Sequence, residues 1–299
     1  MSRVLVTGGS GFLGQRLKKY QDNWVYVSSK ECDLTNNKKV RELFMDVQPD
    51  SIVHLAARVG GIKDNIENQA DFFHINTMMN TNVIHQAHLS NIDRVLSCLS
   101  TCAFPNTVDD YPFAEEQMFQ GPPANSNFSY GMTKRMLQVS SMAYRKQYKR
   151  NYSTFCPSNL YGPGDHFNSE KSHFVPALIT KVSTLSDGDT LKLWGTGKPL
   201  RQQLYVDDLC QIIPMLLDSH NSDIPLIVAP SENLSISTMT KILLKTINKE
   251  LDIEYNLELD GQFRKDGANK KLLELIGNYD FTPFSKGIES TYKWYMENK

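Results

Sequence analysis

A glycine-rich loop near the start of the chain constrains the fold more than any other feature. Val4-Leu5-Val6 is a short apolar run typical of a buried strand, and an apolar helical face begins at Leu13. Where the strand gives way to the helix, Gly8, Gly11 and Gly14 recur every three residues. Glycines in this context permit a tight turn, close approach of the backbone to a pyrophosphate and close packing of helix on strand. The loop therefore predicts a dinucleotide site at the N-terminus of a helix.

Strands and helices alternate through the first half of the chain. Apolar and β-branched runs predict further strands at 24–27, 52–57, 94–99 and 152–156. Apolar residues with helical spacing predict helices at 40–47, 72–84 and 129–148. Apolar strands separated by helices are typical of a parallel sheet covered on both faces, and right-handed crossovers make such a sheet doubly wound. We therefore expect an α/β fold.

The second half is less regular and predicts a smaller α/β domain. Residues 157–168 are rich in Gly, Pro and Asn and predict a loop, whereas helices are expected near 174–183, 206–217 and 237–247. We expect a cofactor-binding domain over 1–165, to which 200–229 returns. The substrate-binding domain is then expected over 166–199 and 230–299.

The residues after the second predicted strand bear on the choice between NAD and NADP. An acidic residue at this strand end binds the ribose 2′-hydroxyl of NAD. Here Ser28-Ser29-Lys30 offers hydroxyls and a cation, which suit a 2′-phosphate, whereas Glu31 opposes that interpretation. Asp33 and Leu34 are expected to begin the next helix. There Asp33 either reaches the adenine amine or caps the helix.

A tyrosine and a lysine lie four residues apart in the helix expected after the fourth strand. Tyr130 and Lys134 share one helical face. An ammonium beside a phenol lowers the pKa of the phenol, so we expect Tyr130 to exchange a proton near neutral pH. Ser100 follows the fourth strand and can hydrogen-bond the same substrate oxygen. Such a pair is frequent by chance, and its position after this strand gives it weight.

With these features the chain resembles the extended short-chain dehydrogenase/reductase superfamily, and within it the epimerase-reductases of GDP-linked 4-keto sugars. The glycine loop and the Tyr–Lys pair belong to the whole superfamily. Segments that carry the closer resemblance are 54–61, 99–105, 157–163, 172–176 and 194–201. The resemblance spans nearly the whole chain. It implies an NAD(P)-binding Rossmann fold, a substrate-binding C-terminal domain, NADPH as cofactor, a GDP-sugar as substrate and no metal.

The resemblance also assigns roles to matching positions. Tyr130, Lys134 and Ser100 match the reductase triad, while Cys102 matches the epimerisation base and His173 the acid. The implied cofactor contacts are Gly8, Ser10, Gly11, Phe12, Leu13, Gly14, Ser28, Ser29, Lys30, Asp33, Leu34, Leu55, Ala56, Ala57, Leu99, Tyr130, Lys134, Pro157, Asn159, Leu160 and His173. The implied substrate contacts are Asn159, Lys181, Trp194, Arg201, Asp260 and Lys265. Lys181 stands where relatives can have arginine, so it keeps the charge without the forked geometry.

The reaction implied by the resemblance converts GDP-4-keto-6-deoxy-D-mannose to GDP-L-fucose. The C3 and C5 protons lie next to the C4 ketone, so a base can remove them while O–H donors stabilise the enolate. Cysteine and histidine side chains titrate close enough to neutrality to serve as base and acid, the roles that fall to Cys102 and His173. NADPH then delivers hydride to C4, and Tyr130 protonates the new alkoxide.

Other functions stay open from the residues alone. The same chemistry can act on a UDP- or dTDP-linked ketone, and a nucleotide-sugar 4-epimerase needs neither Cys102 nor His173. A 4,6-dehydratase is disfavoured, because an Asp-Glu pair is expected where Cys102-Ala103 stands. A non-catalytic NADP-binding sensor or scaffold is disfavoured because such proteins usually lose the tyrosine or the lysine.

Composition bears on partners and compartment. Lys and Arg number 32 against 33 Asp and Glu, so we expect no nucleic-acid surface. No apolar run approaches the roughly 18 residues of a membrane span, and the first residues lack the pattern of a signal peptide. Five cysteines without a Cys-x-x-Cys pair favour a reducing, cytoplasmic compartment. Surplus apolar residues in the helices near 72–89 and 129–148, with the analogy of superfamily relatives, predict a homodimer.

Overall fold

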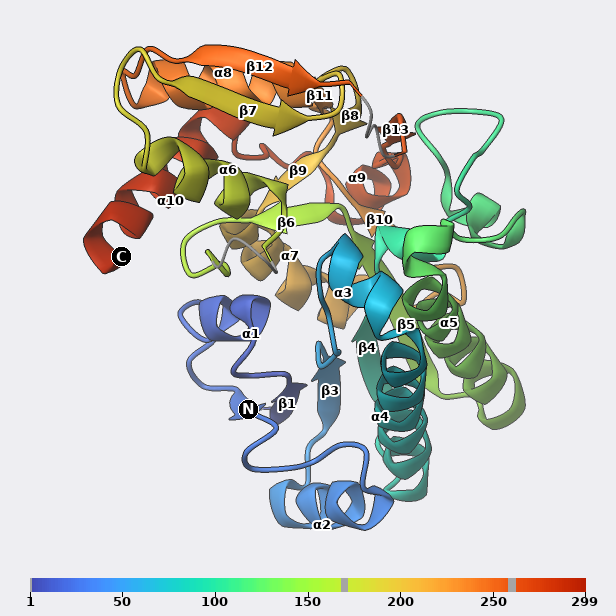
Figure 1. Ribbon diagram of the computed structural model, residues 1–299. Helices are drawn as coiled ribbons and strands as arrows, with labels where there is room; N and C mark the ends of the chain where they lie inside the picture. The colour runs from blue at the N-terminus through green and yellow to red at the C-terminus, as the bar shows by residue number, and fades with distance from the viewer. Residues whose placement is uncertain (1, 168–171, 258–261) are drawn as a thin grey trace.

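Six parallel strands form the central sheet. The computed structural model describes residues 2–167, 172–257 and 262–299 (Figure 1). The strands stand in the order β10-β5-β4-β3-β1-β2, and every pair is parallel. Their bounds are β1 Val4–Thr7, β2 Val25–Val27, β3 Ser51–His54, β4 Arg94–Cys98, β5 Asn151–Pro157 and β10 Leu226–Val228.

Alternating side chains build an apolar core on each face of the sheet. Leu5, Ile52 and Val95 belong to one core, whereas Val4 and Val6 belong to the other. The first core is covered by α2 Asn37–Val47, α4 Gln69–Leu89 and α5 Phe128–Tyr148. The second is covered by α1 Phe12–Leu17, α7 Val206–Ser219 and α9 Lys270–Ile276. Helices on both faces of a parallel sheet confirm the predicted doubly wound α/β fold.

A smaller α/β lobe adjoins the sheet at the top of Figure 1. Its strands form small sheets and pairs: β7 Thr190–Trp194 with β12 Asp252–Asn256, β8 Leu200–Arg201 between β11 Leu234–Ser235 and β13 Arg264–Lys265, and β6 Asn159–Tyr161 with β9 Gln203–Tyr205. Around a third core pack α6 Phe174–Ser183, α8 Ile236–Thr246 and α10 Phe284–Asn298. The chain leaves this lobe through α7 and rejoins the central sheet as β10, beside β5. The domain boundaries proposed from the sequence stay a prediction.

Short helices connect the elements that lead to the site. They are α3 Ile62–Glu67, η1 Thr101–Ala103, η2 Glu115–Phe119 and η3 Asn125–Asn127. None of the helices within the described ranges is both long enough and apolar enough to cross a membrane.

The expectation of a loop over 157–168 is wrong for its first residues. Asn159–Tyr161 forms β6, which pairs in parallel with Gln203–Tyr205. A three-residue strand is too short to show periodicity, and its partner lies more than forty residues further along the chain. Only the tertiary pairing creates this strand.

The expected start of the second helix at Asp33 is also wrong. The helix α2 begins at Asn37, and the Asn36 side chain accepts a hydrogen bond from the Lys39 N–H at 3.2 Å. Asp33 instead accepts bonds from the main-chain N–H and the hydroxyl of Thr35, at 3.0 and 2.7 Å. Its carboxylate thus stabilises a local turn and does not cap the helix.

Candidate active site

Many of the predicted cofactor residues lie at one edge of the central sheet. They follow the carboxyl ends of parallel strands: residues 8–14 follow β1, 28–30 follow β2, 55–57 follow β3, Leu99 follows β4, and Pro157 ends β5 just before Asn159 and Leu160. Parallel strands end at the same edge, and the strand order reverses around β1. Doubly wound folds bind their ligands at this point.

Steric contacts explain the glycines of the loop after β1. A Cβ on Gly14 would collide with the Gly8 oxygen, and a Cβ on Gly8 would lie 2.8 Å from the Ala56 nitrogen. Gly8 also has a φ of +78°, which other residues rarely adopt. Its oxygen accepts from the Gly11 N–H at 3.0 Å, which closes a tight turn. Ser10 and Gly11 are exposed, so the turn is open to a pyrophosphate and fits a dinucleotide.

The end of β2 carries an acid as well as the predicted cation. Glu31 accepts hydrogen bonds from the N–H and the hydroxyl of Ser28, at 2.7 and 2.8 Å, and these bonds lower the pKa of Glu31. Ser29 and Lys30 are exposed beside it. Leu34 has its side chain in the core, 6% exposed. The predicted contacts of these residues with a cofactor, including that of Lys30 with a 2′-phosphate, stay predictions.

Tyr130 and Lys134 are together on α5, but the expected effect of the lysine is wrong. Burial raises the pKa of Tyr130 well above its usual value, and a hydrogen bond with Ser100 offsets this only in part. The Lys134 Nζ lies 5.8 Å from the centre of the Tyr130 ring and donates to the Cys98 oxygen at 2.8 Å. Removal of the phenol from water is the largest cause of this upward shift in the pKa of Tyr130. The role of Tyr130 as a proton donor stays a prediction.

Cys102 lies in the η1 turn, which follows the end of β4. Its main-chain N–H donates to the Ser100 hydroxyl at 3.2 Å. Its sulfur is within 2.9 Å of the Asn127 Nδ2 and 3.4 Å of the Lys265 Nζ. The sulfur also contributes to the electrostatics of Tyr130. The candidate base and the candidate proton donor are thus neighbours.

Asn127 is a site residue that sequence reasoning missed. It lies three residues before Tyr130, at the N-cap of α5. The available signal was an asparagine directly before the helix that carries the Tyr–Lys pair. That signal is weak, because asparagine is common at N-caps for purely local reasons.

His173 is the N-cap residue of α6, in the smaller lobe. As a whole residue it is exposed to solvent. Burial lowers the pKa of His173, and the charges of His166 and Lys265 lower it further. Lys265 thus influences His173 and contacts Cys102, which ties the candidate acid and base to one neighbourhood.

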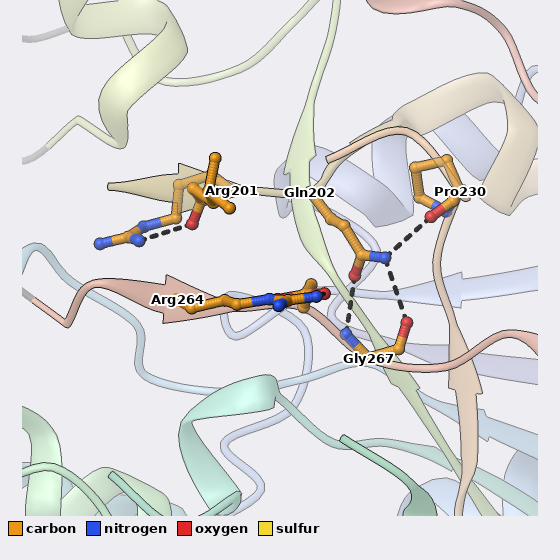
Figure 2. A network of polar contacts seen from close by, with 7 residues as sticks. Arg201, Gln202, Pro230, Arg264 and Gly267 are labelled. Atoms are coloured by element: carbon orange, nitrogen blue, oxygen red, sulfur yellow. Dashed lines mark hydrogen bonds and ion pairs between the residues drawn. The ribbon is translucent and has the colours of Figure 1, made fainter. Parts of the chain in front are cut away.

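Arg201 and Lys265 lie side by side on β8 and β13, where they are register partners. Figure 2 shows how the segment after β13 is held. Gln202 donates to the oxygens of Pro230 and Gly267, at 2.9 and 3.1 Å, and accepts from the Gly267 N–H at 2.8 Å. Gln202 is only 4% exposed, so this network is buried and well determined. It holds the segment after β13, on which Lys265 lies next to Arg201 in the register; the predicted contacts of Arg201 and Lys265 with a diphosphate stay predictions.

The other predicted substrate residues have less defined surroundings. Lys181 donates to the Lys192 oxygen on β7. Trp194 ends β7 with 78% of its surface exposed. Asp260 lies outside the described residues. The predicted contacts of these residues with a nucleotide-sugar stay predictions.

His54 and Cys98 pack as structural residues. His54 is buried and hydrogen-bonded to Thr7 at 2.7 Å and to Asn80 at 3.1 Å, and burial lowers its pKa to about 4. Burial raises the pKa of Cys98 to about 11. Both groups are neutral at pH 7 and tie β3 and β4 into the core.

The parallel sheet, the glycine loop and the Tyr130–Lys134 pair define an NAD(P)-dependent enzyme of the epimerase and reductase class. Comparison with known proteins gives the family. Residues 4–228 match the NAD dependent epimerase/dehydratase family, and the chain belongs to it.

Individual relatives sharpen this assignment. A GDP-L-fucose synthase of Dictyostelium discoideum is 34% identical, over 99% of this chain and 95% of that protein. A probable GDP-L-fucose synthase of Drosophila melanogaster is also 34% identical, over 100% of this chain and 98% of that one. The crystal structure of a GDP-L-fucose synthetase from Naegleria fowleri bound to NADP has a TM-score of 0.92 and 31% identity, over 99% and 93% of the two chains. The resemblance predicted from the sequence is confirmed.

Proposed function

We propose that this protein is a bifunctional epimerase-reductase that converts GDP-4-keto-6-deoxy-D-mannose to GDP-L-fucose with NADPH. The observation that carries the proposal is the cluster of Cys102, Tyr130 and Lys265 at the carboxyl edge of the sheet. An enzyme that only reduces the C4 ketone needs the Tyr130 phenol but no further base. The Cys102 sulfur beside that phenol adds a base next to the same C4 carbonyl. The names of the relatives support the GDP-linked substrate.

Epimerisation uses Cys102 and His173. The Cys102 sulfur removes the proton at C3 or C5, and the electron pair moves onto the C4 carbonyl oxygen. The O–H groups of Tyr130 and Ser100 donate to this enolate oxygen. His173 returns a proton from the opposite face, which inverts the centre. The lowered pKa of His173 makes its imidazolium a better acid for this step.

Reduction uses Tyr130 and Lys134. NADPH, when bound, supplies the hydride that reduces C4. Tyr130 gives its phenolic proton to the oxygen at C4, and its raised pKa keeps that proton in place until the strongly basic alkoxide forms. Lys134, fixed by the Cys98 oxygen, holds a positive charge beside the ring.

The decisive experiment supplies the purified protein and NADPH with two ketones in parallel, one GDP-linked and one UDP-linked. We expect NADPH oxidation with GDP-4-keto-6-deoxy-D-mannose and formation of GDP-L-fucose, identified by NMR. Absence of oxidation with the GDP-linked ketone refutes the proposal. Equal rates with both ketones refute its GDP selectivity.

The proposed oligomer is a homodimer formed through α4 and α5. Phe73 and Leu89 on α4 are 47% and 60% exposed, and Val139 and Met142 on α5 are 51% and 37% exposed. These two helices lie side by side, so their exposed apolar side chains favour a partner of the same kind. The proposed compartment is the cytoplasm, which suits the five free cysteines.

A further inference from the structure

Asn127 stands at the N-cap of α5 without capping the helix. An asparagine at this position ordinarily accepts a hydrogen bond from an N–H of the first turn, which stabilises a helix by about 1 kcal/mol. Within the described part of the chain its side chain makes no such bond. The amide is turned toward Cys102, with 2.9 Å between Nδ2 and the sulfur. The side chain thus contacts a candidate catalytic group in place of its own helix.

The Cys102 sulfur receives two nitrogen donors. Besides the Asn127 amide, the Lys265 ammonium lies 3.4 Å away. A thiol is a weak hydrogen-bond acceptor, whereas a thiolate is the form that a nearby cation and amide donors favour. The two donors come from segments far apart in the chain, η3 and β13. Their convergence on one atom suits an anion on sulfur.

The carboxamide oxygen of Asn127 is buried and has no hydrogen-bond partner among the residues that the structure describes. Buried amides in structural roles ordinarily satisfy both ends. Here only the nitrogen is satisfied, and its acceptor is the sulfur. The contact with Cys102 therefore decides the orientation of the amide.

We propose that Asn127 is a positioning residue that directs the Cys102 sulfur at the sugar and stabilises the negative charge on the sulfur when it acts as a base. When the thiolate acts, the C–H bond breaks, an S–H bond forms, and the electron pair moves to the C4 carbonyl oxygen. The Asn127 N–H groups stabilise the anion before the transfer and fix its direction. The inference rests on the proposed function, but its test needs no sugar nucleotide.

The test is alkylation of Cys102 by iodoacetamide as a function of pH, followed by mass spectrometry of the peptide that carries residue 102. Asn127→Asp keeps the shape of the side chain but replaces its donors with a negative charge. Asn125→Asp puts the same charge on the same turn at an exposed residue. For Asn127→Asp we expect alkylation at pH 7.5 to slow at least ~10-fold and its profile to move to higher pH. Asn125→Asp is expected to follow the wild type.

A profile of Asn127→Asp that superposes on that of the wild type overturns the inference. Asn127→Ala removes the donors without adding charge and covers the case in which the aspartate variant does not fold. We expect it to slow alkylation about 3-fold, in line with the loss of one amide donor. Alkylation of folded Asn127→Ala at the wild-type rate also overturns the inference. A wild type that reduces no ketone refutes the proposed function. The alkylation rates still test the effect of Asn127 on Cys102, because that assay contains no sugar nucleotide.

Discussion

At the residue scale, burial is the largest cause of the pKa shifts of two candidate catalytic groups. It raises the pKa of Tyr130 and lowers that of His173. Asp165, between β6 and α6, follows the same rule. Its Oδ1 accepts from the His166 N–H at 2.7 Å, while its Oδ2 is buried without a partner within the described ranges. Burial raises the pKa of Asp165 to about 7.

This shift predicts a pH dependence of stability. The pKa of Asp165 in the folded protein exceeds the usual value of about 3.9, which applies to the unfolded chain. The contribution of this carboxyl to stability is therefore fully present below pH 3.9, or about that value, and is lost as the pH rises through about 7. Asp165→Asn cannot ionise, so between pH 5 and pH 8 we expect the wild type to lose about 2 kcal/mol relative to it. Urea unfolding at both pH values measures the difference. For the exposed control Asp109→Asn, the difference in unfolding free energy from the wild type should be the same at both pH values. The same result for Asp165→Asn would contradict the prediction.

At the element scale, the loop between β1 and α1 depends on close backbone packing. Gly14→Ala places a methyl group against the Gly8 oxygen, so the first turn of the helix must move away from the loop. We expect NADPH to bind at least ~10-fold more weakly, because the helix N-terminus no longer lies against the pyrophosphate. Quenching of intrinsic fluorescence during titration with NADPH measures the affinity.

Gly121→Ala is a matched control for this loop. Its Cβ would lie 3.4 Å from the nearest atom, a Pro105 carbon, which is an ordinary contact. We expect it to bind NADPH as the wild type does. Unchanged affinity in Gly14→Ala would show that the phosphates do not lie over this helix.

At the scale of the whole molecule, the exposed apolar face of α4 and α5 predicts the dimer. Val139→Glu puts a charge in the middle of this face, and burying an unpaired carboxylate costs several kcal/mol. We expect the wild type to be a dimer and Val139→Glu a monomer in sedimentation velocity at micromolar concentration. Met215→Glu, on an exposed site of α7 across the sheet, should stay dimeric. A monomeric wild type, or a dimeric Val139→Glu, would contradict the proposed interface.

Local chemistry explains why much of this protein was predictable from its sequence. The spacing of Gly8, Gly11 and Gly14 serves one turn, and the Tyr130–Lys134 spacing serves one helical face. Alternation of apolar strands with helices determines the doubly wound sheet, since each strand needs cover on both faces. These features depend on residues close together in the chain, so a linear pattern carries them.

Tertiary structure alone decided the surroundings of Cys102 and the protonation of Tyr130. Asn127 and Lys265 reach the sulfur from 25 and 163 residues away. The place of Lys265 depends on the pairing of β8 with β13, next to the buried Gln202 network. Burial of Tyr130, against the expected influence of Lys134, is likewise a property of the packed fold. The sequence by itself determined which reactive groups the protein has, whereas folding determined their distances and their contact with water, on which protonation depends.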